Sequence, residues 1–128
     1  MPPSTMRALL LHSLDGADGL AIAEVPVPGG PDDVIIEVYA AGVGFPDLLM
    51  TKGQYQFRPN PPFIPGVEAA GIVLSAPSSS GYRTGDRVIA SSRLGAWAEI
   101  AAAHPLSTMP IPEGMSFEEA TAMVNYQT

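Results

Sequence analysis

Proline and glycine interrupt this chain so often that long regular elements cannot form. The 128 residues include 14 prolines and 13 glycines, spread without a repeat. Proline cannot donate to a β-ladder, and glycine permits the tight turns that join short elements. Because 46% of the residues are hydrophobic and only 15% are charged, the chain is expected to fold. The pattern is typical of one domain built from short strands and turns.

Apolar runs between these interruptions predict the strands. The clearest is "DVIIEVYAAGV" (33–43), with even-numbered side chains from Val34 to Val38 on one face and odd-numbered ones from Ile35 to Tyr39 on the other. The other predicted strands are 6–13, 19–28, 66–76, 86–92, 96–104 and 106–112. In the 66–76 run, Gly66 and Gly71 permit a bend or a close approach of backbone. The proline-rich segment 54–63 is predicted to be extended and irregular.

Two segments are predicted to be helical. Residues 46–53 begin with Pro46 and end with a glycine, and Asp47 can accept hydrogen bonds from free amides at the helix start. Residues 116–128 begin with Ser116 and carry Glu119 three residues later, which is a capping-box signature. No glycine or proline closes this second helix, so we interpret the chain as truncated there. Strands followed by one helix predict a mainly β fold, either a small barrel or a sandwich.

Charge and composition exclude several classes of function. The formal net charge is -7 with only 6 Lys and Arg residues, which argues against a nucleic-acid partner. The absence of cysteine excludes disulfides, cysteine-ligated zinc and a thiol nucleophile. No run approaches the ~20 apolar residues of a membrane span, and the N-terminal apolar run is too short for a signal peptide. A soluble, cytoplasmic protein without a membrane partner is therefore expected.

The stretch "GVGFPDLL" (42–49) follows the clearest strand and could be a phosphate-binding turn. A dinucleotide fingerprint needs a third glycine and a helix that opens under the pyrophosphate. Here Asp47 would repel phosphate and Pro46 removes an amide donor. The strands are also not separated by helices, so this interpretation fails.

Five collinear segments instead carry a family resemblance. They are "AAGVGFPDLLMTKGQY", "PPFIPGVEAAGIV", "YRTGDRVIA", "GAWAEIAAA" and "IPEGMSFEEATAM". Together they resemble the N-terminal catalytic domain of medium-chain dehydrogenases/reductases, and most closely the zinc-independent quinone oxidoreductases. The resemblance runs from about residue 6 to residue 128. It implies a GroES-like, partly open β-barrel with short helices over residues 1–128, followed in the full protein by a Rossmann nucleotide-binding domain that this chain lacks.

The chain differs from the zinc-dependent branch of the family at the positions where those relatives bind zinc. The resemblance places Gly44 where those relatives have a cysteine ligand and Val67 where they have a histidine ligand. Neither residue offers a donor atom. Because His12 and His104 lie outside the matching motifs, no catalytic zinc site is expected.

The resemblance also implies the reaction and its cleft. A nicotinamide gives a hydride to a quinone or enone, which requires positioning and exclusion of water more than a dedicated acid or base. NADPH is the implied cofactor and a homodimer the implied full-length assembly. Solvent can supply the proton, and no catalytic residue is assigned. The implied cleft residues are Gly44, Phe45, Tyr55, Phe63 and Thr128. Many members have asparagine at the position of Gly44, so any role here must come from its backbone or from Phe45.

Structural roles compete with several of these assignments. Tyr55 could be an ordinary loop aromatic, and Phe45 and Phe63 could equally be core residues. Trp97 is expected in the barrel core rather than at a cofactor. The two histidines flank strands and are expected at the surface.

Glu68 sits inside an apolar run, where a buried carboxylate needs a partner. We expect a structural ion pair with Arg87 or Arg93 rather than acid catalysis.

A non-enzymatic role is the alternative. The chain could be a GroES-like assembly module, because Ile72, Val73 and Leu74 resemble the apolar tripeptide of co-chaperonin mobile loops. It could also be a stand-alone domain that binds a small apolar ligand. If it is instead a fragment of a reductase, it should be inactive alone and expose apolar surface around "AMVNY" (122–126).

Overall fold

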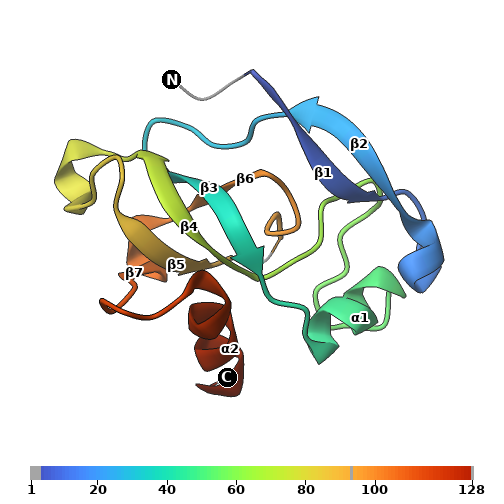
Figure 1. Cartoon of the computed structure of the whole chain (residues 1–128). Helices are drawn as coiled ribbons and strands as arrows, with labels where there is room; N and C mark the ends of the chain where they lie inside the picture. The colour runs from blue at the N-terminus through green and yellow to red at the C-terminus, as the bar shows by residue number, and fades with distance from the viewer. Residues whose placement is uncertain (1–3, 93, 128) are drawn as a thin grey trace.

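The computed structural model describes residues 4–92 and 94–127 and confirms a mainly β fold with short helices (Figure 1). One antiparallel sheet pairs β1 (Thr5–Leu11) with β2 (Leu20–Pro26). A second antiparallel sheet has five strands in the order β6 (Ile100–Ala103), β3 (Val34–Ala41), β4 (Glu68–Ser75), β5 (Arg87–Ser91) and β7 (Thr108–Pro110). Each predicted strand forms within this described part of the chain.

The strand predicted at 96–104 begins only at Ile100. The preceding residues bond elsewhere: the amides of Ala96 and Trp97 donate to the carbonyls of Gly66 and Pro65, at 3.2 and 3.0 Å. The segment is extended, but its partner is the loop before β4 rather than β3.

Strand β3 is buried on both faces near its start. Val34 and Ile36 share one core cluster with Val73 and Val88, while Ile35 packs in another cluster with Met6. The predicted alternation is confirmed, and the β1–β2 sheet explains why the second face is also apolar at Ile35. Farther along the strand that face becomes exposed at Glu37 and Tyr39.

The two glycines of the 66–76 run have the predicted role of permitting close backbone approach. A Cβ atom on Gly71 would overlap the carbonyl oxygen of Glu37 on the neighbouring strand β3. Gly66 has φ +104°, and a Cβ there would lie 2.5 Å from Cδ1 of Trp97. The indole of Trp97 donates from Nε1 to the carbonyl of Gly42 at 2.9 Å, so it ties this loop to the end of β3.

Isolated bridges join β1 to two segments outside the named strands, next to the side-chain packing of Met6 on Ile35. Among the described residues, Ala8 pairs with Ala98 and Leu11 with Phe63. The amide of Leu9 donates to the carbonyl of Trp97 at 2.9 Å, and that of Leu11 donates to the carbonyl of Phe63 at 2.8 Å. This loose closure is consistent with a partly open barrel.

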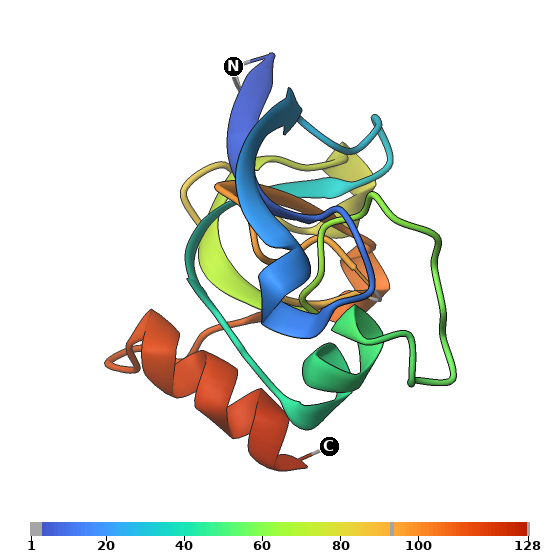
Figure 2. The ribbon, with the colours of Figure 1, turned by 90° about the vertical axis from the view of Figure 1, so that its right-hand side faces the viewer.

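Both α-helices lie at the same end of the molecule (Figure 2). α1 spans Phe45–Thr51 and α2 spans Phe117–Gln127. The predicted capping box of α2 is confirmed: the amide of Ser116 donates to Oε1 of Glu119 at 2.9 Å, and the amide of Glu119 donates to Oγ of Ser116 at 3.0 Å. Short 3-10 helices cover Gly16–Gly19, Ser78–Ser80 and Pro105–Ser107. Within the described residues, no helix is long and apolar enough to cross a membrane.

An aromatic stack fixes the start of α2 on the larger sheet. The rings of Phe117 and Tyr39 stack with centroids 4.8 Å apart. The Arg87 guanidinium carbon lies 4.6 Å from the centroid of the Phe117 ring, and its Nη2 donates to the carbonyl of Met115 at 2.7 Å. The side chain of Arg87 therefore holds the start of α2 against β5.

Other predictions have mixed outcomes. His12 and His104 are exposed, as expected. Trp97 is half-buried and packs against Ala96 and Ala101, so it belongs to the edge of the core. Ile72–Leu74 lie inside β4, with Val73 fully buried, which is unlike a mobile co-chaperonin loop.

Candidate functional site

A cavity of about 650 Å³ lies where α1 begins, beside the start of β4 and the end of β5. It brings together three of the residues that the sequence placed in the cleft, namely Gly44, Phe45 and Tyr55. Its remaining lining residues are Val43, Pro46, Asp47, Val67, Glu68 and Ser91. The wall is therefore mostly apolar and aromatic, with two carboxyl groups set into it.

Gly44 lines this cavity, and its backbone caps α1. It is the N-cap of α1, and its amide donates to Oδ2 of Asp47 at 2.8 Å. Its carbonyl accepts from the amides of Asp47 and Leu48, at 3.1 and 3.3 Å. Both backbone groups of Gly44 are therefore engaged by the helix start. The predicted capping role of Asp47 is confirmed by the same bonds.

Phe45 and Tyr55 form the aromatic walls. The Phe45 side chain is 70% exposed although it is large and apolar, so it is not a core residue. Tyr55 is half-buried and also lines a second cavity of about 470 Å³. Val67 lines both cavities as well, and the second one continues to Met50, Gln56, Phe57 and Ser92.

The other two predicted cleft residues have different positions. Phe63 is 8% exposed and packs in the core with Leu11 and Met50, where its backbone also bridges to β1. The structure therefore places Phe63 in the core, which is the competing role the sequence left open. Thr128 lies outside the described residues.

Asp47 and Glu68 are the buried charged side chains of this cavity, with 1% and 4% of their surface exposed. Oδ1 of Asp47 and Oε2 of Glu68 are buried without a hydrogen-bond partner among the described residues. Burial raises the pKa of Glu68, and the nearby charge of Asp47 raises it further. Burial also raises the pKa of Asp47, against the smaller opposing effect of the hydrogen bond from Gly44. Both groups thus hold protons more tightly than exposed carboxyls do.

The predicted ion pair between Glu68 and Arg87 is wrong. Arg87 is held by Phe117 and the carbonyl of Met115, on the α2 side of the sheet. Arg93, the other candidate, lies outside the described residues. Within the described part of the chain, the ion pair that forms is between Nη2 of Arg7 and Oε2 of Glu99, 3.5 Å apart at the surface.

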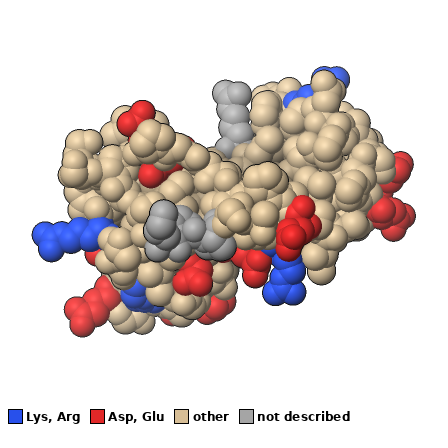
Figure 3. All heavy atoms as spheres, turned by 90° about the horizontal axis from the view of Figure 1, so that it is seen from above, with Lys and Arg blue, Asp and Glu red and all other residues tan. Residues whose placement is uncertain are grey.

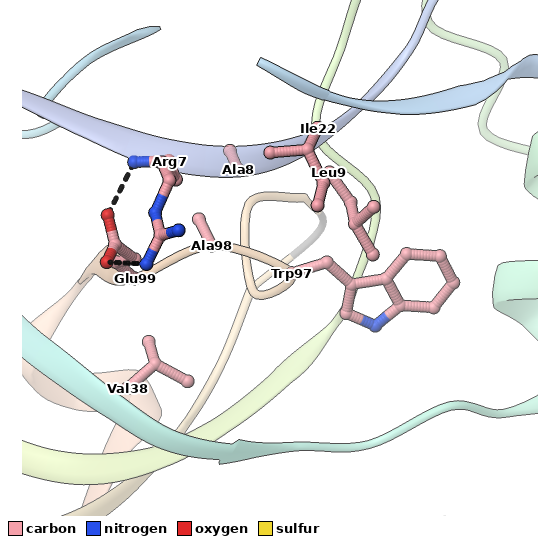
Figure 4. Close-up of a pocket in the computed structure, with 8 residues that line it drawn as sticks. All are labelled: Arg7, Ala8, Leu9, Ile22, Val38, Trp97, Ala98 and Glu99. Carbon is pink, nitrogen blue, oxygen red and sulfur yellow. Dashed lines mark hydrogen bonds and ion pairs between the residues drawn. The ribbon is translucent and has the colours of Figure 1, made fainter. Parts of the chain in front are cut away.

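That surface ion pair lies at a different cavity, of about 430 Å³, between β1 and the segment before β6 (Figure 4). Leu9, Ile22 and Trp97 form its apolar side. Among the described residues, it shares no lining residue with the 650 Å³ cavity and contains none of the predicted cleft residues. Sequence reasoning missed this hollow because its walls come from four segments that are separate in sequence.

The chemistry of the larger cavity suits a flat, uncharged ring. No lysine or arginine is among the described residues that line it. On the face shown in Figure 3, the lysine and arginine side chains lie at separate places rather than in a patch. Gly44 and Val67, which the resemblance in the sequence places at the zinc-ligand positions of zinc-dependent relatives, both line the cavity, and neither side chain offers a donor atom. Within residues 4–92 and 94–127, no group of three or more histidine, aspartate or glutamate side chains is arranged to hold a metal ion.

Comparison with known proteins agrees with the resemblance in the sequence. Residues 30–113 match the alcohol dehydrogenase GroES-like domain family. The chain is 38% identical over 132 residues to the synaptic vesicle membrane protein VAT-1 homolog of Rattus norvegicus, covering 99% of this chain and 32% of that protein. It is 41% identical over 112 residues to quinone oxidoreductase-like protein 2 of Mus musculus, covering 85% and 32%. The chain thus spans about a third of the length of these curated relatives.

Solved structures show the same fold. A probable oxidoreductase from Mycobacterium abscessus superposes with a TM-score of 0.92 at 47% identity, covering 96% of this chain and 40% of that one. The quinone oxidoreductase from Thermus thermophilus, solved also in complex with NADPH, superposes with a TM-score of 0.78 at 37% identity, covering 91% and 36%. The chain belongs to the alcohol dehydrogenase GroES-like domain family, on the quinone oxidoreductase side of the medium-chain dehydrogenase/reductase superfamily.

Proposed function

We propose that this chain is the substrate-side domain of an NADPH-dependent quinone or enone oxidoreductase that works without zinc. A Rossmann domain following residue 128 would bind most of the cofactor. The observation that carries the proposal is the family match combined with one cavity that gathers Gly44, Phe45 and Tyr55. The coverage of about a third of the relatives supports a second domain in the full protein.

The cavity fits the nicotinamide end of such a cofactor and not its phosphates. Phe45, Tyr55 and Val67 offer apolar surfaces against which a flat ring can pack. A phosphate would meet two carboxyl groups and no cationic side chain among the described lining residues. When bound, a reduced nicotinamide supplies a hydride. The residues of this chain would orient the acceptor beside it and exclude water.

The substrate, compartment and assembly follow as parts of the same proposal. The acceptor is a small quinone or enone, because the cavity is mostly apolar and of small-molecule size. We place the full-length enzyme in the cytoplasm as a homodimer.

The proposal is tested on the protein that carries the reading frame beyond Thr128. NADPH oxidation should depend on 1,4-naphthoquinone or 2-cyclohexenone, whereas the 128-residue chain should show none. Tyr55→Ala should lower kcat/KM for these acceptors roughly tenfold because a wall of the cavity is lost. Leu106→Ala is the matched control, since Leu106 is 91% exposed and does not line the cavity. Cofactor binding without reduction of any quinone or enone would refute the proposed activity.

A further inference from the structure

The contacts of the described residues give the carboxyl group of Glu68 no structural role. It starts β4, the central strand of the larger sheet, yet its side chain turns a buried oxygen toward no hydrogen-bond donor of the described residues. An ionised carboxylate in this position would be desolvated without compensation. A neutral carboxyl has a lower desolvation cost and can itself donate a hydrogen bond.

The surroundings of Glu68 favour the neutral form. Among the described residues that line the cavity, the other titratable groups are Asp47 from α1 and Tyr55 from the following loop, and β5 contributes the uncharged Ser91. Asp47 adds a second negative charge, and this repulsion raises the pKa of Glu68 beyond the effect of burial alone. Of two close carboxyl groups, one then retains a proton at a pH where ordinary carboxyls have lost theirs.

The hydrogen bonds indicate which of the two retains it. Oδ2 of Asp47 accepts from the amide of Gly44 at 2.8 Å, and such a bond stabilises the ionised form. The buried Oε2 of Glu68 receives no comparable bond from the described residues. The proton therefore belongs on Glu68, with Asp47 as the neighbour that keeps it there.

The geometry points to Glu68 as the proton donor to the acceptor in this cavity, with Asp47 as its positioning partner. This inference rests on the proposed function and departs from the expectation that solvent protonates the product. A reduced nicotinamide, when bound, would give up a hydride with its electron pair and be oxidised, and a new C–H bond would form at a ring carbon of the acceptor. As that pair enters, the carbonyl π pair moves onto oxygen, and this oxygen takes the Glu68 proton. The O–H bond of Glu68 breaks, and its carboxylate regains a proton from water once the product leaves. In a quinone the hydride adds to a ring carbon, so the product of this step is the keto tautomer. It becomes the hydroquinone when that carbon loses a proton to water and the second oxygen gains one.

The first experiment measures the proton directly on the 128-residue chain. The side-chain carboxyl carbons are followed by ¹³C NMR during a pH titration, with Glu68→Gln used to assign the Glu68 signal. The Glu68 midpoint should lie above the usual range for glutamate and should fall in Asp47→Asn. Glu99, whose pKa is lowered chiefly by the bond from the Arg7 amide, serves as an internal reference that should titrate below that range.

Arg93→Ala tests the competing structural explanation. If Arg93 forms the ion pair expected from the sequence, the wild-type Glu68 midpoint lies at or below the usual range and rises in Arg93→Ala. That result overturns the inference. An elevated wild-type midpoint that does not change in Arg93→Ala supports it. Because the NMR titration does not depend on enzymatic turnover, it tests the protonation of Glu68 even if the proposed function is wrong.

The second experiment uses the protein with its full reading frame and 1,4-naphthoquinone as acceptor. Glu68→Gln should lower kcat by roughly 10²-fold, the usual contribution of a general acid. The wild-type rate should fall as pH rises through the midpoint measured by NMR, and the variant should lack this dependence. A Glu68→Gln enzyme with the wild-type rate and pH profile would refute proton donation by Glu68. Absence of reduction in the wild type would instead refute the proposed function.

Discussion

Gly71 lies where β4 approaches β3 too closely for any side chain. A Cβ at this position would overlap the backbone carbonyl oxygen of Glu37, and a carbonyl within a sheet ladder cannot rotate away as a flexible side chain could. We expect Gly71→Ala to lower the free energy of unfolding by about 3 kcal/mol, at the upper end for overpacking. Urea denaturation measures this loss. Gly30→Ala is the control because nothing lies within 4 Å of its added methyl, and an equal loss there would contradict the explanation.

Glu68 gives the folded protein a specific pH dependence. Burial and then Asp47 raise its pKa in the folded state above that in the unfolded chain. Below the pKa of the unfolded chain, Glu68 is protonated in both states and does not make the free energy of unfolding depend on pH. As pH rises from the unfolded pKa through the folded pKa, the folded state binds more protons and the free energy of unfolding decreases.

Comparison with Glu68→Gln isolates this contribution. The variant keeps the size of the neutral carboxyl but cannot titrate, so its free energy of unfolding should fall less than that of the wild type over this pH window. Glu99 and Glu119 have lowered pKa values, so their contributions are lost as pH falls, and they cancel in the comparison. Urea unfolding at a series of pH values measures the difference. Parallel wild-type and variant curves would show that Glu68 does not titrate abnormally.

At the residue scale, local roles could be predicted and long-range partners could not. The capping role of Asp47 follows from its place three residues after Gly44, so sequence spacing is sufficient. Glu68 was expected to need a partner, but its neighbour is Asp47, a like charge brought there by the fold. No spacing rule relates these two residues, and the attractive choice of Arg87 was wrong because that cation stacks on Phe117.

At the scale of elements, the start of α2 depends on its reciprocal cap. Ser116→Ala removes the Oγ that accepts from the Glu119 amide at 3.0 Å. The expected loss is about 1 kcal/mol in the free energy of unfolding. Urea denaturation followed by far-ultraviolet circular dichroism measures it. Ser79→Ala, on an exposed serine of a 3-10 helix, should change stability little, and a similar loss in both variants would rule out the cap as the cause.

The strands and helices could be predicted because their signals are local. The alternation of side chains between two faces predicted β3, and the spacing of Ser116 and Glu119 predicted the start of α2. The late start of β6 could not be predicted, since the amides of Ala96 and Trp97 bond to a loop distant in sequence. For the same reason Phe63 could not be assigned: its core position follows from its bridge to Leu11.

At the scale of the whole molecule, exposed apolar side chains are concentrated near the start of α1. Val43, Phe45 and Leu48 are 69%, 70% and 49% exposed within six residues of sequence. The expected apolar surface around 122–126 lies largely outside the described side chains. A clustered apolar surface favours association.

We therefore expect the 128-residue chain to self-associate as its concentration rises. The double variant Phe45→Ser, Leu48→Ser should weaken this association and lower the binding of an apolar dye. Sedimentation velocity and dye fluorescence measure both effects. Ile22→Ser is the control, because Ile22 is 72% exposed but lies on β2. A wild-type chain that stays monomeric and binds no dye would contradict the prediction.

The attachment of β1 through isolated bridges has a consequence for how the molecule opens. Backbone hydrogen bonds join β1 to the rest of the fold at Arg7, Leu9 and Leu11, whereas β3 and β4 are paired along most of their length. The β1–β2 ribbon should therefore detach as a unit while the larger sheet stays intact. In native-state hydrogen exchange, amides of β1 should lose protection at lower denaturant than those of Ile36 and Val73. If all of them exchanged only through complete unfolding, the molecule would be one cooperative unit, and the ribbon would be as firmly held as the sheet it covers.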